Sequence, residues 1–143
     1  RKEFNLLIGE ASAEKIKKEV GTAIATSSNT FPVKGRDIRS GTPKEINLKE
    51  EDTADALSPI LQQILQGVKD ALENTPPELS ADLVDMGLTL TGGGALLKNI
   101  DKLLSRETGL PVQIAEDPLA CVAIGTGIAL EQEEIFSTVL SEY

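Results

Sequence analysis

Three consecutive glycines at residues 92–94 are the stretch of this chain with the clearest capacity for chemistry. A short apolar and β-branched run at residues 88–91 precedes them, and an apolar pattern with helical spacing follows directly. A strand that ends in bare backbone before a helix lets a flat or anionic ligand touch main-chain N–H groups near the positive end of the helix dipole. The stretch therefore predicts either a nucleotide-binding loop or a tight strand-to-helix turn.

Known phosphate-binding motifs match this loop in part. A P-loop requires Gly-x-x-x-x-Gly-Lys-Ser/Thr, and Lys98 is misplaced for that pattern. The dinucleotide fingerprint Gly-x-Gly-x-x-Gly/Ala fits at Gly92 and Gly94, but Leu97 occupies the third position, where its bulk would hold helix and strand apart. Glu116 stands about 20 positions further on, where that motif expects an acidic residue. The dinucleotide interpretation thus agrees in outline and fails at one steric point.

The remaining reactive residues form no catalytic set. The sequence has no histidine and one cysteine, which excludes His/Cys zinc sites, serine–histidine triads and disulfides. Cys121 has no partner and is predicted to be a small buried residue. Glu116 and Asp117 together suit Mg²⁺ with a bound phosphate, whereas capping of a helix with Pro118 at its first position is the simpler interpretation. The chain can bind a nucleotide without the means to hydrolyse it.

Composition narrows the possible partners. The 143 residues include 14 basic and 23 acidic side chains, a net charge of −9, which argues against binding of nucleic acid or anionic lipid. Apolar residues make up 40% and aromatic residues 3%, so the core is predicted to be aliphatic. The single cysteine favours a reducing, cytoplasmic setting. Because the sequence opens without a methionine in an apparent helix end, we expect a fragment or a processed product.

Two glycines in the first part of the chain are predicted to end helices. The apolar segment at residues 4–9 is interpreted as the last turn of a helix with Gly9 as its C′ residue. A second helix is predicted to follow, with Ser12 as N-cap and Gly21 as its stop. On that helix, Glu14 lies three residues before Lys17 and four before Lys18. From spacing alone these charges predict a solvated helix face with weak ion pairs.

The residue pattern in the middle of the chain predicts a hairpin and a long helix. Alternating residues at 31–39 and 44–48, separated by Ser-Gly-Thr-Pro, are typical of a β-hairpin. Apolar residues at helical spacing over residues 57–72 predict an amphipathic helix, interpreted as one helix kinked at Pro59 rather than two. The Asn-Thr-Pro-Pro sequence at residues 74–77 is predicted to end it.

The last third reads as alternating strands and helices. A short helix at residues 78–86 precedes the strand and the glycines. A helix ending near residue 108, a strand at 111–115 and a helix at 119–130 with small residues for close packing follow. This order favours a parallel α/β layer. Because two strands are too few for a stable sheet, we expect further strands from elsewhere, and an unpaired edge or apolar face in this chain.

Several segments together resemble the bacterial actin family MreB. They are Asn-Leu-Leu-Ile-Gly-Glu at residues 5–10, Gly-Arg-Asp at 35–37, Gly-Thr-Pro-Lys at 41–44, the run from Thr75 to Leu97 that contains Leu-Thr-Gly-Gly-Gly-Ala, and residues 115–127 with Ala-Glu-Asp-Pro-Leu-Ala-Cys. The resemblance covers nearly all of the chain, and the motifs are specific as a set.

The resemblance implies an α/β fold, namely part of an actin-like (ribonuclease H-like) ATPase domain with an incomplete parallel or mixed sheet, plus a small α+β subdomain with a hairpin. Residues 1–8 would end a helix of the inner subdomain, residues 9–79 would form the small outer subdomain, and residues 80–143 would belong to the inner subdomain with its C-terminal helix. The turn before Leu119 would line the far side of the adenine pocket. The residues implied to bind the adenosine of ATP are Glu14, Lys17, Gly92, Gly93, Gly94 and Ala95.

The same resemblance implies a function. The parent protein would bind ATP, form filaments from copies of itself, and work with the cell-wall elongation machinery to maintain rod shape. It would lie in the cytoplasm at the inner face of the cell membrane, without binding nucleic acid. Phosphate-binding hairpins, Mg²⁺-holding residues and the membrane-contacting element would lie in a first half outside this chain, so the parent would be the slow ATPase. The alternatives are a fragment of a sugar- or acetate-type kinase or of a dinucleotide enzyme, or a structural module without a ligand.

Overall fold

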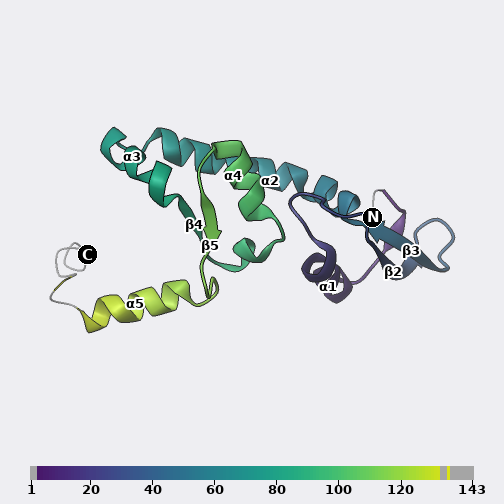
Figure 1. Ribbon diagram of the computed structural model, residues 1–143. Coiled ribbons are helices and arrows are strands. Elements are labelled where there is room, and N and C mark those ends of the chain that lie inside the picture. The colour runs from purple at the N-terminus through teal and green to yellow at the C-terminus, as the bar shows by residue number, and fades with distance from the viewer. Residues whose placement is uncertain (1–2, 133–134, 136–143) are drawn as a thin grey trace.

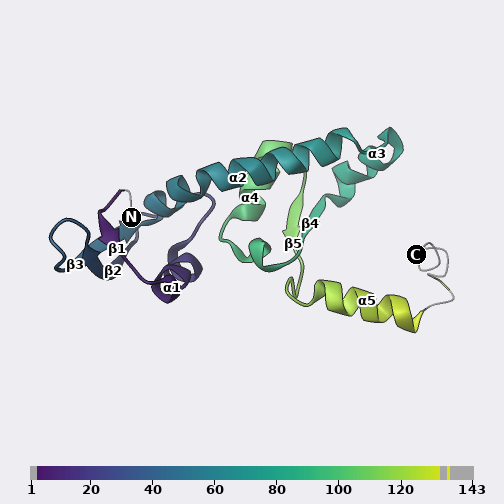
Figure 2. The same ribbon diagram turned by 180° about the vertical axis from the view of Figure 1, so that it is seen from behind.

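The computed structural model describes residues 3–132 and 135. The molecule is elongated, and the helix α2 (Glu50–Glu73) runs along most of its length (Figure 1). A three-stranded antiparallel sheet and helix α1 (Glu10–Val20) lie at one end of α2, and helix α3 (Pro77–Met86) lies at the other. The view from behind shows the same order of elements (Figure 2).

The outer sheet contains the predicted hairpin. Strands β2 (Thr30–Asp37) and β3 (Pro43–Lys49) pair antiparallel, with Val33 opposite Ile46. The turn between them uses Gly41 at a φ of 74°, a conformation that suits glycine. The hairpin prediction is confirmed. The sequence could predict it because the two strands and their turn are neighbours in the chain, so the pattern depends on no distant segment.

Residues 6–7 form a strand, which corrects the prediction that residues 4–9 are the last turn of a helix. Strand β1 (Leu6–Leu7) pairs antiparallel with β2, and Leu6 faces Asp37. Gly9 is then the residue before α1, which begins at Glu10 without a cap from Ser12. The sequence pattern failed here because three adjacent apolar residues have no period, so a distant strand decided their conformation.

The long helix α2 is a single element through Pro59, as predicted. Its first turn carries three acidic residues, and the Asp52 carboxylate accepts a hydrogen bond of 2.8 Å from the Lys49 backbone N–H. This satisfies one of the donors that a helix start would otherwise leave free. Leu61 and Leu65 on its apolar face enter the core. The helix ends at Glu73, with Asn74 as its C-cap residue, before the two prolines.

Residues 77–131 alternate helices and strands as predicted. Strands β4 (Leu88–Leu90) and β5 (Val112–Ile114) form a two-stranded parallel sheet. Helix α4 (Ile100–Thr108) connects them on the side that faces α2, and Gly109 ends it at a φ of 73°. The core lies between α2 and α4 and is aliphatic; it consists of Ala23, Leu61, Leu65, Ile100, Leu103 and Leu104.

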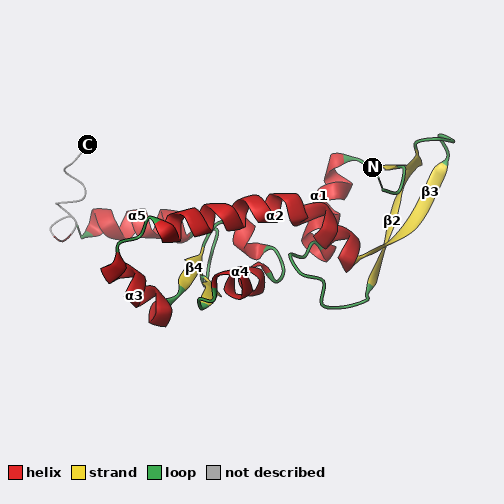
Figure 3. Ribbon diagram, turned by 90° about the horizontal axis from the view of Figure 1, so that it is seen from above, coloured by secondary structure: helices red, strands yellow, loops and turns green. Residues whose placement is uncertain are grey.

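Helix α5 (Cys121–Glu131) lies on the side of β4 and β5 away from α2 (Figure 1), so that it lies in line with α2 in the view from above (Figure 3). None of its described residues is buried, and Val122, Ile124 and Leu130 are exposed. The predicted burial of Cys121 is wrong, since the side chain is half-exposed, and no atom approaches a Cβ position of Gly125 or Gly127 within 4 Å. The prediction of an exposed apolar face is confirmed for the described residues. Most of the predicted tail at residues 131–143 lies outside them.

No helix among the described residues is both long and apolar enough to cross a membrane.

Lowering the pH is expected to destabilise the hairpin through Asp37. Its carboxylate accepts hydrogen bonds from Lys44 Nζ at 3.0 Å and from the Ser40 and Arg39 backbone, and these bonds lower the pKa of Asp37 from 3.8 to about 2. A lowered pKa contributes stability that is present above 3.8 and is lost as the pH falls toward 2. In chemical unfolding at several pH values, Asp37→Asn should show a shallower loss across this window. An unchanged slope would contradict the assignment.

Candidate functional site

The glycine loop has an unusual backbone. Gly92 adopts a φ of 78° and a ψ of 174°, a region essentially open to glycine alone. The backbone then forms one turn of 3-10 helix, η1 (Gly93–Leu96). A Cβ at Gly94 would meet no atom within 4 Å, so this face of the turn is bare main chain. Ala95 points inward and is 4% exposed, which leaves only its backbone for a ligand.

Helix α4 starts at Ile100, which corrects the prediction that a helix follows the glycines at once. Leu97 is extended, with a ψ of 126°, and Asn99 adopts a left-handed backbone with a φ of 60°. Between them, Lys98 forms a parallel bridge with Thr22, far away in sequence. This pairing interrupts the helix, so a ligand at the glycines meets a 3-10 turn instead of the start of α4.

The turn after β5 lies against the glycines. The Gly92 backbone N–H donates to the Pro118 carbonyl, and the Cβ position of Gly93 is 3.5 Å from Leu119 Cδ2. Asp117 caps this turn, because its carboxylate accepts a hydrogen bond of 3.2 Å from the Ala120 N–H. The predicted helix cap is wrong, because α5 begins at Cys121, its N-cap residue is Ala120 without a side-chain cap, and Pro118 lies in the turn before the helix. No group of three or more potential metal ligands occurs among the described residues.

The two candidate residues on α1 are paired with each other. Lys17 Nζ lies 2.6 Å from a Glu14 carboxylate oxygen, and Lys18 Nζ lies 3.7 Å from the other. The hydrogen bond from Lys17 lowers the pKa of Glu14, so this carboxylate is an acceptor and not a proton donor at neutral pH. Both side chains are about half exposed, at 48% for Glu14 and 56% for Lys17. The pair is therefore accessible to a ligand.

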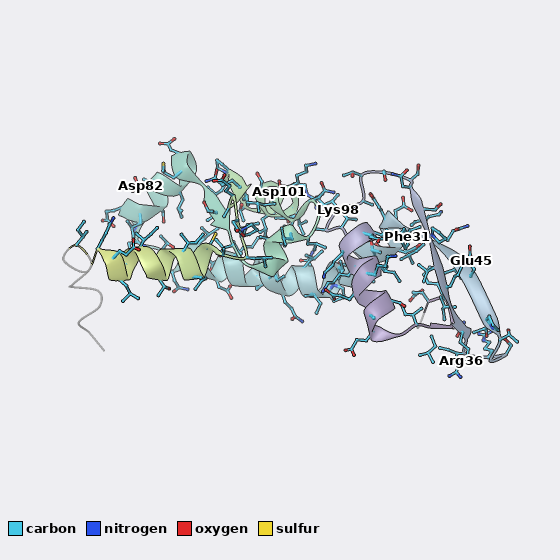
Figure 4. All side chains as sticks on the ribbon, turned by 90° about the horizontal axis from the view of Figure 1, so that it is seen from below. Phe31, Arg36, Glu45, Asp82, Lys98 and Asp101 are labelled. Atoms are coloured by element: carbon cyan, nitrogen blue, oxygen red, sulfur yellow. The ribbon has the colours of Figure 1, made fainter. Side chains whose placement is uncertain are left out.

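A short junction links the end of α1 and the residues after it to Lys98, which follows the glycine turn. The Ala23 N–H donates to the Lys98 carbonyl at 2.8 Å, and Lys98 Nζ donates to the Glu19 carbonyl at 2.6 Å. Lys98 lies between the end of the molecule that carries α1 and the hairpin and the end that carries α3 (Figure 4). Both α1 and η1 lie on the same side of α2 in two opposite views (Figures 1 and 2). Sequence reasoning missed Thr22, Lys98 and Asn99, because nothing local marks a contact across 76 residues.

The glycine loop is an open surface in the described part of the chain. Its glycines do not line either of two shallow hollows found elsewhere on the described residues. One lies beside α4 and β5, and the other lies on the hairpin. Leu97 packs against the core and supplies bulk where a dinucleotide fold requires a small residue. The geometry thus fits one wall of a binding cleft.

Comparison with protein families gives one match over most of the chain. The model of a family described as MreB/Mbl protein matches residues 1–138. The chain is 48% identical over 132 residues to the cell shape-determining protein MreB of Escherichia coli, and 46% identical over 132 residues to the cell shape-determining protein Mbl of Bacillus subtilis. These alignments cover 92% of this chain but 38% and 40% of the relatives.

Solved structures show the same likeness. MreB5 of Spiroplasma citri bound to ADP superposes with a TM-score of 0.85 and 39% identity over 97% of this chain and 42% of that chain. The same protein bound to AMPPNP gives a TM-score of 0.84. A non-polymerising MamK mutant, at 16% identity and a TM-score of 0.65, shares the fold. The chain thus spans about two fifths of the length of the MreB and Mbl proteins that it matches.

Proposed function

Because this chain belongs to the MreB/Mbl family, we propose that it forms the adenosine-binding wall of an ATP site in a filament-forming, cell shape-determining protein. The actin-like fold class predicted from the sequence is confirmed by the match to MreB5. The observation that supports the proposal is the junction of Thr22 with Lys98, which links the segment after α1, the helix that carries the exposed Glu14–Lys17 pair, to the segment after the bare glycine turn. The MreB5 structures bound to ADP and AMPPNP support it.

Each proposed contact follows from the chemistry of its residue. The nucleoside lies on the main chain of Gly92, Gly93, Gly94 and Ala95, where a flat ring needs backbone without side chains. Glu14 is ionised and accepts hydrogen bonds from ribose hydroxyls. Lys17 donates to oxygen or nitrogen atoms of the nucleoside and remains paired with Glu14. These groups bind and orient the ligand.

The hydrolytic chemistry is assigned to other parts of the protein. The described residues hold no cluster that suits a metal ion, and Glu14, as a carboxylate, has no proton to give. When bound, Mg²⁺ with ATP would neutralise phosphate charge through residues outside this chain. In this proposal the chain contributes binding energy and orientation to a slow ATPase. The kinase and dinucleotide alternatives gain no support from the site.

We propose two subdomains and a set of partners on the same basis. Residues up to about 79 form a small outer subdomain, and residues 80–143 form part of the inner one. Because β1 pairs with β2, residues 6–7 belong with the outer sheet. Copies of the protein assemble into filaments in the cytoplasm, at the inner face of the cell membrane, and engage the cell-wall elongation machinery.

Lys17→Ala should weaken ATP binding by the full-length protein by roughly tenfold, the typical loss for one hydrogen bond to a charged group. Isothermal titration with ATP measures the affinity. Lys15→Ala is the matched control, because Lys15 is an exposed lysine on the same helix that pairs with Glu19 instead. Equal affinities for both variants and the unmodified protein would contradict the assignment of α1 to the site.

A further inference from the structure

The end of α1 is held by side chains from two other elements. The Glu19 carbonyl accepts Lys98 Nζ at 2.6 Å, and the Val20 carbonyl accepts the Thr53 hydroxyl from α2 at 3.1 Å. The last carbonyls of a helix lack partners within the helix, so partners from elsewhere fix its direction. The C-terminal end of α1 is therefore held in place. Glu14 and Lys17 lie nearer to the N-terminal end of the same helix.

The side chain of Asn99, the residue before α4, binds the segment that follows α1. Its Nδ2 atom donates to Thr22 Oγ1 at 3.0 Å and to the Ile24 carbonyl at 3.1 Å. Thr22 has no exposed surface, and its hydroxyl donates to the Ile24 carbonyl at 2.6 Å. Thr22 is buried and Asn99 is half-buried, so the hydrogen bonds between them fix the local geometry, because a polar group left unpaired here would lose part of its solvation without compensation.

The backbone at Asn99 explains why this residue type suits the position. Its φ of 60° lies in the left-handed region, which asparagine tolerates better than most residues. The same conformation ends the bridge between Lys98 and Thr22 and lets α4 begin at Ile100. Lys98 follows η1 by one residue, Leu97. Asn99 therefore connects the glycine turn to the residues that follow α1.

We propose that Asn99 is a positioning residue for the nucleotide site, because its side chain sets the separation between the Glu14–Lys17 pair and the glycine turn. A ligand that touches both surfaces binds tightly only when they are held at the correct distance before it arrives. The inference rests on the proposed nucleotide site and adds to it a residue that need not touch the nucleotide. Asn99 affects nucleotide binding by fixing the position of α1.

Asn99→Gly in the full-length protein tests this role. Glycine accepts the left-handed backbone but removes both side-chain hydrogen bonds. We expect ATP affinity to fall by about fivefold, comparable to the loss of one neutral hydrogen bond. Asn5→Gly is the matched control, since Asn5 is the other non-glycine residue with positive φ in the described chain, at 49°, and lies before β1. That variant should bind ATP with unchanged affinity.

A double-mutant cycle with Lys17→Ala separates positioning from a general loss of stability. If Asn99 acts through α1, Asn99→Gly should weaken ATP binding less when Lys17 is already absent. Equal losses in both backgrounds, or no loss in either, would overturn the inference. Chemical unfolding of each variant confirms that the folded protein is being titrated. If Asn99→Gly does not fold, Asn99→Asp keeps the shape but removes the amide donors, and the same outcomes apply.

The two proposals fail in different ways. Should Lys17→Ala weaken ATP binding while folded Asn99→Gly does not, the nucleotide site stands and the positioning role is wrong. Should Lys17→Ala and Asn99→Gly both leave ATP affinity unchanged, the α1 assignment fails and the positioning role fails with it. Thr22→Ser, which retains the hydroxyl that accepts from Asn99, should stay within about twofold of the unmodified affinity, and a larger loss would contradict the hydrogen-bond mechanism.

Discussion

Gly94→Val is expected to weaken ATP binding by the full-length protein by about tenfold or more, a free-energy cost of about 1.4 kcal/mol or greater. A side chain at Gly94 would meet no protein atom within 4 Å, and the backbone there does not have positive φ. The fold can thus accept the substitution, whereas a nucleoside lying on this backbone would be displaced by the new methyl groups. Isothermal titration with ATP gives the measurement.

Gly67→Val is the matched control for Gly94→Val. Gly67 lies on the exposed side of α2, and a Cβ there also meets no atom within 4 Å. This variant should bind ATP normally. Gly92 is unsuitable for the test, because its φ of 78° would strain any other residue. Unchanged affinity in folded Gly94→Val protein would exclude the glycine turn as the nucleoside surface.

Polymerisation supplies a second readout for the same variant. If nucleotide binding drives assembly, sedimentation of the unmodified protein should depend on ATP, and Gly94→Val should need more ATP to pellet to the same extent. Gly67→Val should behave as the unmodified protein does. An unmodified protein that pellets neither with nor without ATP, over a range of salt concentrations, would contradict the proposed filament.

Leu104→Ala is expected to lower the free energy of unfolding by about 2–5 kcal/mol, because it removes a buried side chain and leaves a cavity. Leu104 is 2% exposed and lies at the centre of the aliphatic core between α2 and α4. No aromatic side chain belongs to this core cluster, so no large neighbour is at hand to fill the space. Denaturant unfolding, with the slope m compared between variants, measures the change.

Two controls define the result for Leu104→Ala. Leu104→Met conserves volume and should cost less than about 1.5 kcal/mol. Ile60→Ala removes an apolar side chain that is 54% exposed on α2, and should change stability by about 0.5 kcal/mol or less. A loss below about 1 kcal/mol for Leu104→Ala would show that the core between α2 and α4 does not stabilise the protein as described.

Local patterns predicted most elements correctly. The hairpin turn at Gly41, the apolar period of α2 and the two prolines after Asn74 each act within a few residues, so the sequence carries their full signal. The parallel pairing of β4 with β5 followed from the helix between them. These elements needed no knowledge of distant parts of the chain.

The errors occurred where a distant segment decides the local conformation. Residues 6–7 became a strand because β2 offered them hydrogen-bond partners. The helix after the glycines was delayed to Ile100 because Lys98 pairs with Thr22. The burial of Cys121 was wrong because the described chain places no element against α5. In each case, contacts with distant segments, or their absence, outweighed the local preference that the sequence pattern indicates.

For the proposed site, the sequence by itself determined the chemical groups and the family to which they belong. Bare glycine backbone and a Glu–Lys pair at helical spacing are local features, and the resemblance made them candidates. Only the tertiary structure decided that the residues after α1 pair with the residues after the glycine turn. That arrangement depends on Thr22, Lys98 and Asn99, whose hydrogen bonds join residues more than 70 positions apart. Such bonds form only after the core has brought both segments together, so no local pattern specifies them.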